Sequence, residues 1–233
     1  MTPLTLDASA VVWSVPPVDR AAALSEAPLL VLMHGRGSHE NDLAGLMPLL
    51  PTGIVFAAVR APITVGLNSY SWFDDGSPGM PSAEAADAAV DATLRWLDGL
   101  VVAGLVSSTT PIGALGFSQG GAMAVHLMRR AANRFASFVN LAGFSLPGQW
   151  PDDERLRLSP PPMFWGRDPE EPVIPSSATE RTALWLPQHS TLTDREYPGI
   201  GHSISRDELD DVNAFLRRTL PSKTTRPTNS LSA

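Results

Sequence analysis

A serine flanked by glycines at residues 116–120 carries the strongest chemical signal in the chain. These residues read GFSQG and fit the pattern G-x-S-x-G, in which a strand turns sharply into a helix and exposes a serine hydroxyl. A short glycine-serine string also occurs in flexible loops, so the flanking sequence decides between the two interpretations. The apolar run 111–115 fits a buried strand and residues 122–128 fit a helix. This setting predicts that Ser118 is a nucleophile.

A serine hydroxyl needs a general base, and three histidines follow Ser118 in the chain. His126 falls within the helix expected after the serine, where a packed or surface histidine is the simpler interpretation. His189 lies in a stretch expected to turn from a helix into a strand. His202 follows a glycine-rich stretch that would let a loop carry the imidazole over the edge of a sheet. We therefore predict that His202 is the base.

The acid that orients such a base is expected between the serine and the histidine, after a strand that ends at Gly166. Asp168, Glu170 and Glu171 all lie at suitable positions. At least one of them must be a solvated charge of the loop. The residues alone therefore leave the acid open among these three.

Attack on a carbonyl group creates an oxyanion, which needs preorganised backbone N–H donors. One donor would be the amide of Gln119, directly after the serine. The second would come from the glycine-containing loop at residues 34–37, which follows an early apolar run. His34 in this loop could be a second base, but a histidine that braces the loop is the better interpretation.

Alternating strand and helix patterns predict the elements that must position these residues. Continuous apolar runs at 28–33 and 54–59 are typical of strands buried on both faces of a parallel sheet. Ser82 is expected to cap a helix over 83–102. Further strands are expected at 10–15, 135–141, 163–166 and, at a sheet edge, 191–197, with helices at 41–50, 176–186 and 207–219 and a long aromatic loop at 60–76. The fold class is therefore α/β, with a mostly parallel central sheet and helices on both faces.

Length and composition limit the possible partners. The 233 residues suffice for a single domain over 1–220, and the polar stretch 221–233 is expected to be a disordered tail. A net charge of −7 argues against nucleic acid and anionic membrane as partners. The absence of cysteine removes disulfides and thiolate metal sites. With no secretory signal and no spanning stretch, we expect a cytoplasmic protein without stable membrane insertion.

Six short motifs occur in an order that resembles one known family. They are HGRG at 34–37, RAP at 60–62, SWFD at 71–74, GFSQGG at 116–121, PVIP at 172–175 and GH at 201–202. Together they resemble the phospholipase/carboxylesterase family of α/β-hydrolases, which includes acyl-protein thioesterase-like enzymes and small bacterial carboxylesterases. The resemblance extends over about residues 10–219 and implies an α/β-hydrolase fold, a Ser-Asp-His triad, and neither a metal nor an organic cofactor.

The resemblance also implies roles for individual residues. It assigns the two oxyanion donors to the amides of Arg36 and Gln119. The family's acid usually opens an Asp-Pro-x-x-Pro run, and residues 171–175 read EPVIP here, so the register favours Glu171 over Asp168. Glutamate can serve as the acid on this fold, although its extra methylene would need a shifted loop.

Two further positions follow from the resemblance. Trp72 and Phe73 are expected to line the acyl pocket, as the relatives suggest, and the alternative is that these aromatic side chains pin a long loop to the core. Trp165 stands where many relatives carry histidine, and we expect it to contribute packing alone.

Together, the candidate residues and the family resemblance predict a serine hydrolase of the carboxylesterase or phospholipase type. It would cleave small-molecule carboxylic esters, or thioesters, of small or medium acyl groups through an acyl-enzyme intermediate. We expect a monomer or a homodimer. The alternative from another class is a non-catalytic small-molecule-binding protein on the same fold. A pure binder has no need of a nucleophile, a base and oxyanion donors together, which favours the enzyme.

Overall fold

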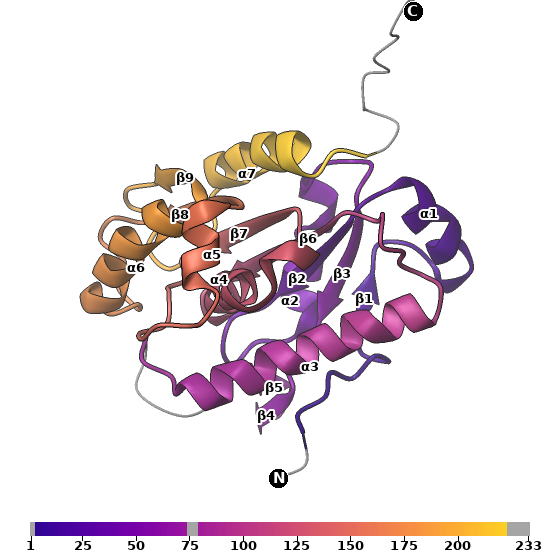
Figure 1. Cartoon of the computed structure of the whole chain (residues 1–233), viewed down its shortest axis with the longest axis horizontal. Coiled ribbons are helices and arrows are strands. Elements are labelled where there is room, and N and C mark those ends of the chain that lie inside the picture. Colours follow the sequence, from indigo (N-terminus) through magenta and orange to yellow (C-terminus); the bar gives the residue numbers. More distant parts are fainter. Residues whose placement is uncertain (1–2, 74–78, 223–233) are drawn as a thin grey trace, which may run out of the picture.

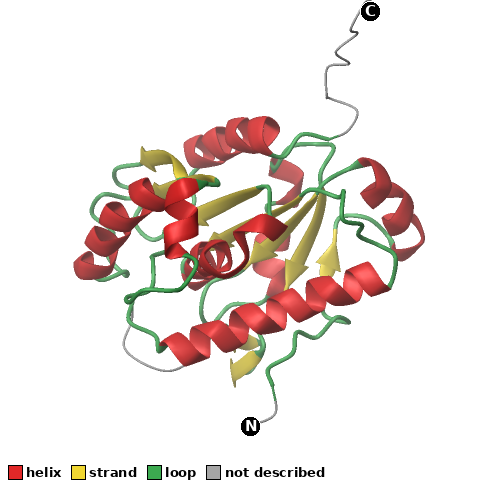
Figure 2. Ribbon diagram, in the orientation of Figure 1, coloured by secondary structure: helices red, strands yellow, loops and turns green. Residues whose placement is uncertain are grey.

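The computed structural model of the chain describes residues 3–73 and 79–222, and its central feature is a seven-stranded sheet (Figure 1, Figure 2). The strand order is β1-β3-β2-β6-β7-β8-β9. The strands are β1 (Val12–Trp13), β2 (Leu29–Met33), β3 (Val55–Val59), β6 (Ile112–Phe117), β7 (Ser137–Leu141), β8 (Pro162–Arg167) and β9 (Thr191–Glu196). All neighbouring strands pair in parallel except β1, which is antiparallel to β3. The predicted mostly parallel sheet, with the 191–197 strand at its edge, is confirmed.

Helices cover both faces of this sheet, as expected. One face carries α1 (Arg20–Glu26), α3 (Ala83–Val102), α4 (Gln119–Ala131), α5 (Asp153–Leu158) and α6 (Ser176–His189), and the other carries α2 (Glu40–Ala44) and α7 (Arg206–Thr219). Successive side chains of a strand point to opposite faces. On β2, Val31 and Met33 accordingly join the first core, while Leu30 and Leu32 join the second. Burial on both faces explains the continuous apolar run of this strand.

The helix expected over 41–50 is shorter than the sequence suggested. α2 ends at Ala44, and a separate 3₁₀ turn covers Met47–Leu49. Pro48 lies within that turn, has no N–H to donate, and would clash with the preceding helical turn if α2 continued. The short helices α1 and α5 were not expected from the sequence. The Ser82 cap of α3 is confirmed, because its side chain accepts a hydrogen bond from the Ala85 amide.

The stretch read as a long aromatic loop contains a small hairpin. Strands β4 (Ile63–Gly66) and β5 (Ser69–Ser71) pair in antiparallel fashion, and Asn68 in their turn has φ 51°. Asparagine tolerates this left-handed conformation better than most residues. The amide of Gly37 donates to the Tyr70 carbonyl over 2.8 Å, so the hairpin lies beside the 34–37 loop. Residues 74–76 of the expected loop are outside the described part.

Two expectations about the whole chain stay predictions. The assignment of residues 1–220 to one domain is one of them. The other is disorder of the tail 221–233, which from residue 223 onward lies outside the described residues.

Within 3–73 and 79–222, no helix is both long and apolar enough to cross a membrane.

The sheet brings several loops to one edge. Met33, the last residue of β2, pairs in register with Gly116 of β6. The loops that follow these two parallel strands therefore start side by side. The loops after β8 and β9 leave from the same end of the sheet, because these strands are parallel too. In open α/β sheets this carboxyl edge is where ligands bind.

Candidate active site

Ser118 stands in the sharp turn between β6 and α4. Its φ of 55° and ψ of −116° are unusual for a residue with a side chain, and such strain is typical of functional sites. The Ser118 amide donates to the Leu141 carbonyl over 2.8 Å, and the Ala122 amide donates to the Ser118 carbonyl over 3.0 Å. A Cβ on Gly120 would collide with the carbonyl of Met33. The elbow therefore needs glycine there, and the expected strand, turn and helix are confirmed.

His202 approaches the serine from the loop between β9 and α7. Its Nε2 atom lies 2.9 Å from Ser118 Oγ. The loop turns through Gly199 and Gly201, whose φ angles of 85° and 61° favour glycine. The imidazole packs against Phe117, with ring centroids 4.9 Å apart. The serine hydroxyl can donate to this nitrogen, which is the geometry that a general base requires.

Glu171 lies against the other nitrogen of the imidazole. Both carboxylate oxygens are 3.0 Å from His202 Nδ1, and the side chain is only 4% exposed. Its Oε1 also accepts hydrogen bonds from the amides of Val173, over 2.7 Å, and Ile174, over 3.2 Å. A carboxylate can only accept, so Nδ1 carries the proton and Nε2 is left to accept from Ser118. The register of the EPVIP run therefore pointed to the residue that contacts the imidazole.

The side chain of Asp168 binds the backbone of the loop that carries His202. One carboxylate oxygen accepts from the Gly201 amide over 2.6 Å, and the other accepts from the Glu170 amide over 2.9 Å. The amides of Glu170 and Gly201 hold the pKa of the Asp168 carboxyl below its usual value. The side chain of Glu170, the third acid that the sequence left open, is exposed. Asp168 thus anchors the residue next to His202.

The two residues predicted to donate to an oxyanion lie on adjacent segments, the start of α4 and the loop after β2. Gln119 is the first residue of α4, and the first N–H groups of a helix have no acceptor within it. Arg36 lies between Gly35 and Gly37 in the loop after β2. A Cβ added to Gly35 would be 3.4 Å from Ser118 Cβ, so this loop passes directly beside the elbow. The donor role of the two amides stays a prediction.

His34 braces the loop after β2, which is the interpretation that the sequence favoured over a second base. Its imidazole is buried, and Nε2 accepts a hydrogen bond from the Ala61 amide over 3.1 Å. Nδ1 then carries the proton and donates to the Gly35 carbonyl over 2.8 Å. Burial lowers the pKa of His34, which favours this neutral form.

The two other histidines after the serine pair with groups outside the elbow. His126 is fully buried in α4, and Nε2 lies 2.7 Å from the Asp87 carboxylate. Burial lowers the pKa of His126 to about 4. His189 ends α6, and its Nδ1 lies 2.7 Å from the Trp185 carbonyl oxygen of the same helix. Both contacts fit a structural role.

Trp72 and Phe73 lie beside the elbow but face protein groups. Their side chains are 0% and 5% exposed. The Trp72 indole donates to the His34 carbonyl over 2.9 Å, and the Trp72 amide donates to the Gln119 side chain over 2.9 Å. These contacts favour the alternative in which the aromatic side chains pin the loop to the core. The part played by the Gln119 side chain was missed, because nothing in the motif indicates where it points.

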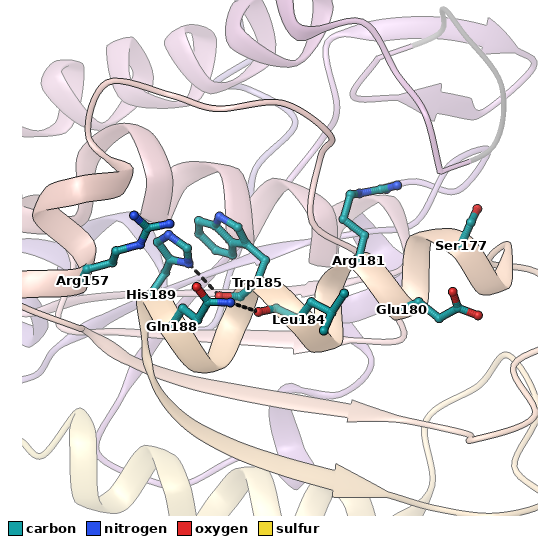
Figure 3. A pocket seen from close by; sticks show the side chains of 8 residues that line it. All are labelled: Arg157, Ser177, Glu180, Arg181, Leu184, Trp185, Gln188 and His189. Carbon is teal, nitrogen blue, oxygen red and sulfur yellow. Dashed lines mark hydrogen bonds between the residues drawn. The ribbon is translucent and has the colours of Figure 1, made fainter.

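A pocket of about 420 Å³ lies elsewhere, along α5 and α6 (Figure 3). Its walls are formed by Arg157, Ser177, Glu180, Arg181, Leu184, Trp185, Gln188 and His189. Ser118, Glu171 and His202 are not among these residues, so the pocket is separate from the three paired side chains. In the part of the chain that the structure describes, no three His, Asp or Glu side chains gather as a metal ion would require.

Comparisons with known proteins identify the family of the chain. Residues 19–220 match the family described as Phospholipase/Carboxylesterase. Acyl-protein thioesterase 1 of Gibberella zeae is 29% identical over 180 residues, which cover 71% of this chain and 76% of that protein. Lysophospholipase-like protein 1 of Mus musculus is 24% identical over 214 residues, which cover 84% and 88%.

Solved structures share the fold. The Bacillus cereus carboxylesterase superposes with a TM-score of 0.74 at 18% identity, covering 90% of this chain and 94% of that one. Esterase PE8 superposes with a TM-score of 0.74 at 24% identity, covering 93% and 100%. Likeness at this identity supports the fold, and the family match spans most of the chain. This protein therefore belongs to the phospholipase/carboxylesterase family of hydrolases.

Proposed function

We propose that this protein is a serine esterase whose triad is Ser118, His202 and Glu171. The observation that carries the proposal is the continuous set of contacts among the three side chains. Ser118 Oγ lies 2.9 Å from one imidazole nitrogen, and the Glu171 carboxylate lies 3.0 Å from the other. A nucleophile, a base and an orienting acid in this arrangement can perform acyl transfer.

In the acylation step, Ser118 Oγ attacks the carbonyl carbon of an ester or thioester while His202 Nε2 takes the proton of the serine hydroxyl. The carbonyl π-electrons move to oxygen, and the amides of Gln119 and Arg36 donate hydrogen bonds to that oxyanion. Glu171 stays ionised and stabilises the imidazolium. The imidazolium then protonates the leaving alcohol or thiol as its bond to carbon breaks, and the acyl group remains on Ser118.

In the deacylation step, a water molecule replaces the alcohol. His202 takes a proton from the water as its oxygen attacks the acyl-enzyme, and a second oxyanion forms at the same donors. When this intermediate collapses, the bond to Ser118 Oγ breaks and the imidazolium returns a proton to that oxygen. The carboxylic acid leaves and the enzyme regains its starting state.

The names of the relatives support the substrate class. Acyl-protein thioesterase 1 and the Bacillus cereus carboxylesterase are named for thioester and ester hydrolysis. We propose that this protein cleaves oxyesters or thioesters with small or medium acyl groups. We further propose that it works in the cytoplasm as a monomer or homodimer, which light scattering after size-exclusion chromatography would distinguish.

The test is hydrolysis of p-nitrophenyl esters from acetyl to long acyl chains, and of matching acyl thioesters, by the wild type and by Ser118→Ala. We expect Ser118-dependent turnover, with kcat lowered by about 10⁴- to 10⁶-fold in the variant. Circular dichroism should show the same fold for both proteins. Wild-type-like turnover in Ser118→Ala would contradict the proposal. If the wild type neither turns over any substrate nor reacts with a serine-directed phosphonate, the binding-protein alternative would replace it.

A further inference from the structure

Trp72 and the side chain of Gln119 connect the two segments that carry the candidate oxyanion donors, the start of α4 and the loop after β2. The Gln119 carboxamide is 5% exposed, and its Oε1 accepts from the Trp72 amide over 2.9 Å. Its Nε2 donates to the Phe73 carbonyl over 2.6 Å. The indole N–H of Trp72 then donates to the His34 carbonyl over 2.9 Å. A buried chain of hydrogen bonds therefore leads from the start of α4 to the end of β2.

The chemistry of these groups fixes how the Gln119 side chain is oriented. The Trp72 amide can only donate, and the Phe73 carbonyl can only accept. In a carboxamide the oxygen accepts and the NH2 group donates, so the side chain satisfies both partners when Oε1 faces Trp72 and Nε2 faces Phe73. Ser71 Oγ lies 3.1 Å from both atoms and gives the buried amide a third partner. The segment from Ser71 to Phe73 is thus tied to the residue that follows the nucleophile.

The other end of the connection is equally constrained. His34 receives the indole hydrogen bond on its carbonyl oxygen, while its imidazole is fixed by the Ala61 amide and the Gly35 carbonyl. Arg36, the second candidate donor, follows directly after Gly35. The connection therefore reaches the loop next to Arg36, whereas its opposite end is the side chain of Gln119 itself.

We propose that Trp72 and the Gln119 carboxamide are positioning residues that set the separation between the backbone amides of Arg36 and Gln119. This inference rests on the proposed function, in which those two amides stabilise the oxyanion. Hydrogen-bond donors lower the energy of a transition state when they are held in place before the charge develops, and small displacements weaken them. The 0% exposure of Trp72 assigns it to positioning rather than to contact with the substrate.

The first test is Trp72→Phe, with Trp165→Phe as a matched control. Both tryptophans are 0% exposed, and among the described residues the Trp165 indole nitrogen has no hydrogen-bond partner. Both changes remove the same ring and N–H group from the core, but only the first cuts the connection. We expect Trp72→Phe to lower kcat by about 10- to 100-fold, with KM within about threefold of the wild type. We expect Trp165→Phe to keep kcat and KM within about threefold.

A second variant and a second readout address the donors more directly. Gln119→Met keeps the backbone amide and a side chain of similar length but removes the hydrogen bonds of the carboxamide to Ser71, Trp72 and Phe73. We expect the same fall in kcat as for Trp72→Phe. A trifluoromethyl ketone forms a tetrahedral oxyanion adduct with a nucleophilic serine, so its inhibition constant should rise in both variants by the factor that kcat/KM falls. Loss of packing alone would not produce that match.

The outcomes separate this inference from the proposed function. If turnover depends on Ser118 but Trp72→Phe and Gln119→Met behave like Trp165→Phe, the positioning role is wrong and the esterase stands. A raised KM with unchanged kcat in Trp72→Phe would overturn it in favour of substrate contact. If Trp72→Phe fails to fold, Gln119→Met decides by the same criteria. Absence of any Ser118-dependent turnover would remove the proposed function and this inference together.

Discussion

The two sides of the candidate site are held by groups of different charge. On the side of the base, the carboxylates of Glu171 and Asp168 bind the imidazole of His202 and the loop before it. On the side of the oxyanion donors, the connecting groups are the neutral carboxamide of Gln119 and the neutral indole of Trp72.

This difference matches the charges that the proposed reaction creates. His202 becomes a cation during each step, and a carboxylate beside it lowers the energy of that cation. The carbonyl oxygen becomes an anion, and a second anion nearby would raise its energy in a site shielded from water. The buried imidazole of His34 is neutral as well, since burial lowers its pKa. On each side of the candidate site, the charge of the supporting groups therefore matches the charge that the proposed reaction forms there.

Replacing Glu171 by glutamine should impair the base, with a larger effect than Gln119→Glu or Glu208→Gln. The amide keeps the size of the side chain but removes its charge and can donate to Nδ1, which favours the wrong imidazole tautomer. We expect kcat to fall by about 10³- to 10⁴-fold. In Asp168→Asn, the matched control, we expect a loss of about tenfold or less, because Asp168 binds backbone amides. Equal losses of kcat in the two variants would contradict the assignment of the acid.

The reverse exchange, Gln119→Glu, should weaken the stabilisation of the oxyanion. It adds a charge of the same sign as the oxyanion and removes the group that donates to the Phe73 carbonyl. We expect kcat to fall by about 100-fold. The loss should deepen as pH rises, because only the ionised carboxylate repels the oxyanion. The ratio of mutant to wild-type kcat, measured across pH, tests this, and Gln119→Met should give a flat ratio. A flat ratio for Gln119→Glu would argue against charge as the cause.

A third carboxyl, that of Glu208 in the first turn of α7, differs from those of Glu171 and Asp168. Its expected effect is smaller and concerns the stability of the fold. It is buried, and within the described residues neither of its oxygens has a hydrogen-bond partner. Burial raises its pKa from 4.5 to about 7. Between these two values the folded protein binds more protons than the unfolded chain, so stability falls as pH rises, by at most about 1.4 kcal/mol per pH unit.

Above a pH of about 7, this contribution of Glu208 should level off. The variant Glu208→Gln should lose the slope, whereas Glu154→Gln, a change at an exposed side chain, should keep it. Urea unfolding at several pH values between about 5 and 8 measures the difference. A slope that persists in Glu208→Gln would show that another group titrates.

The contacts among Ser118, His202 and Glu171 could be anticipated from the sequence because local patterns specify where these residues lie. The elbow needs a strand, small residues and a helix, and residues 111–128 carry all three in order. Chain order and the glycine-rich stretch before it favoured His202, and the register of one motif in the family resemblance favoured Glu171 over Asp168. The sheet was predictable from its apolar runs, because strands buried on both faces have no polar side. The hairpin of β4 and β5 was missed because most of β4 is exposed and forms no such run.

The supports on the donor side could not be predicted in the same way. The Gln119 carboxamide forms hydrogen bonds with Ser71, Trp72 and Phe73, which precede it in the chain by 46 to 48 positions. Such pairings depend on how residues 71–73 pack against the start of α4, and no local propensity specifies them. The aromatic character of Trp72 was compatible with both substrate contact and packing, and only its burial and its indole hydrogen bond separate the two.

The most direct test of the triad is the rate and site of labelling by a fluorophosphonate, followed by peptide mass mapping. In the wild type we expect one adduct, on Ser118, and in Ser118→Ala no adduct. In His202→Asn we expect labelling at least about 10³-fold slower, because the serine then lacks its base. An adduct on another residue, or a rate that does not depend on His202, would contradict the triad.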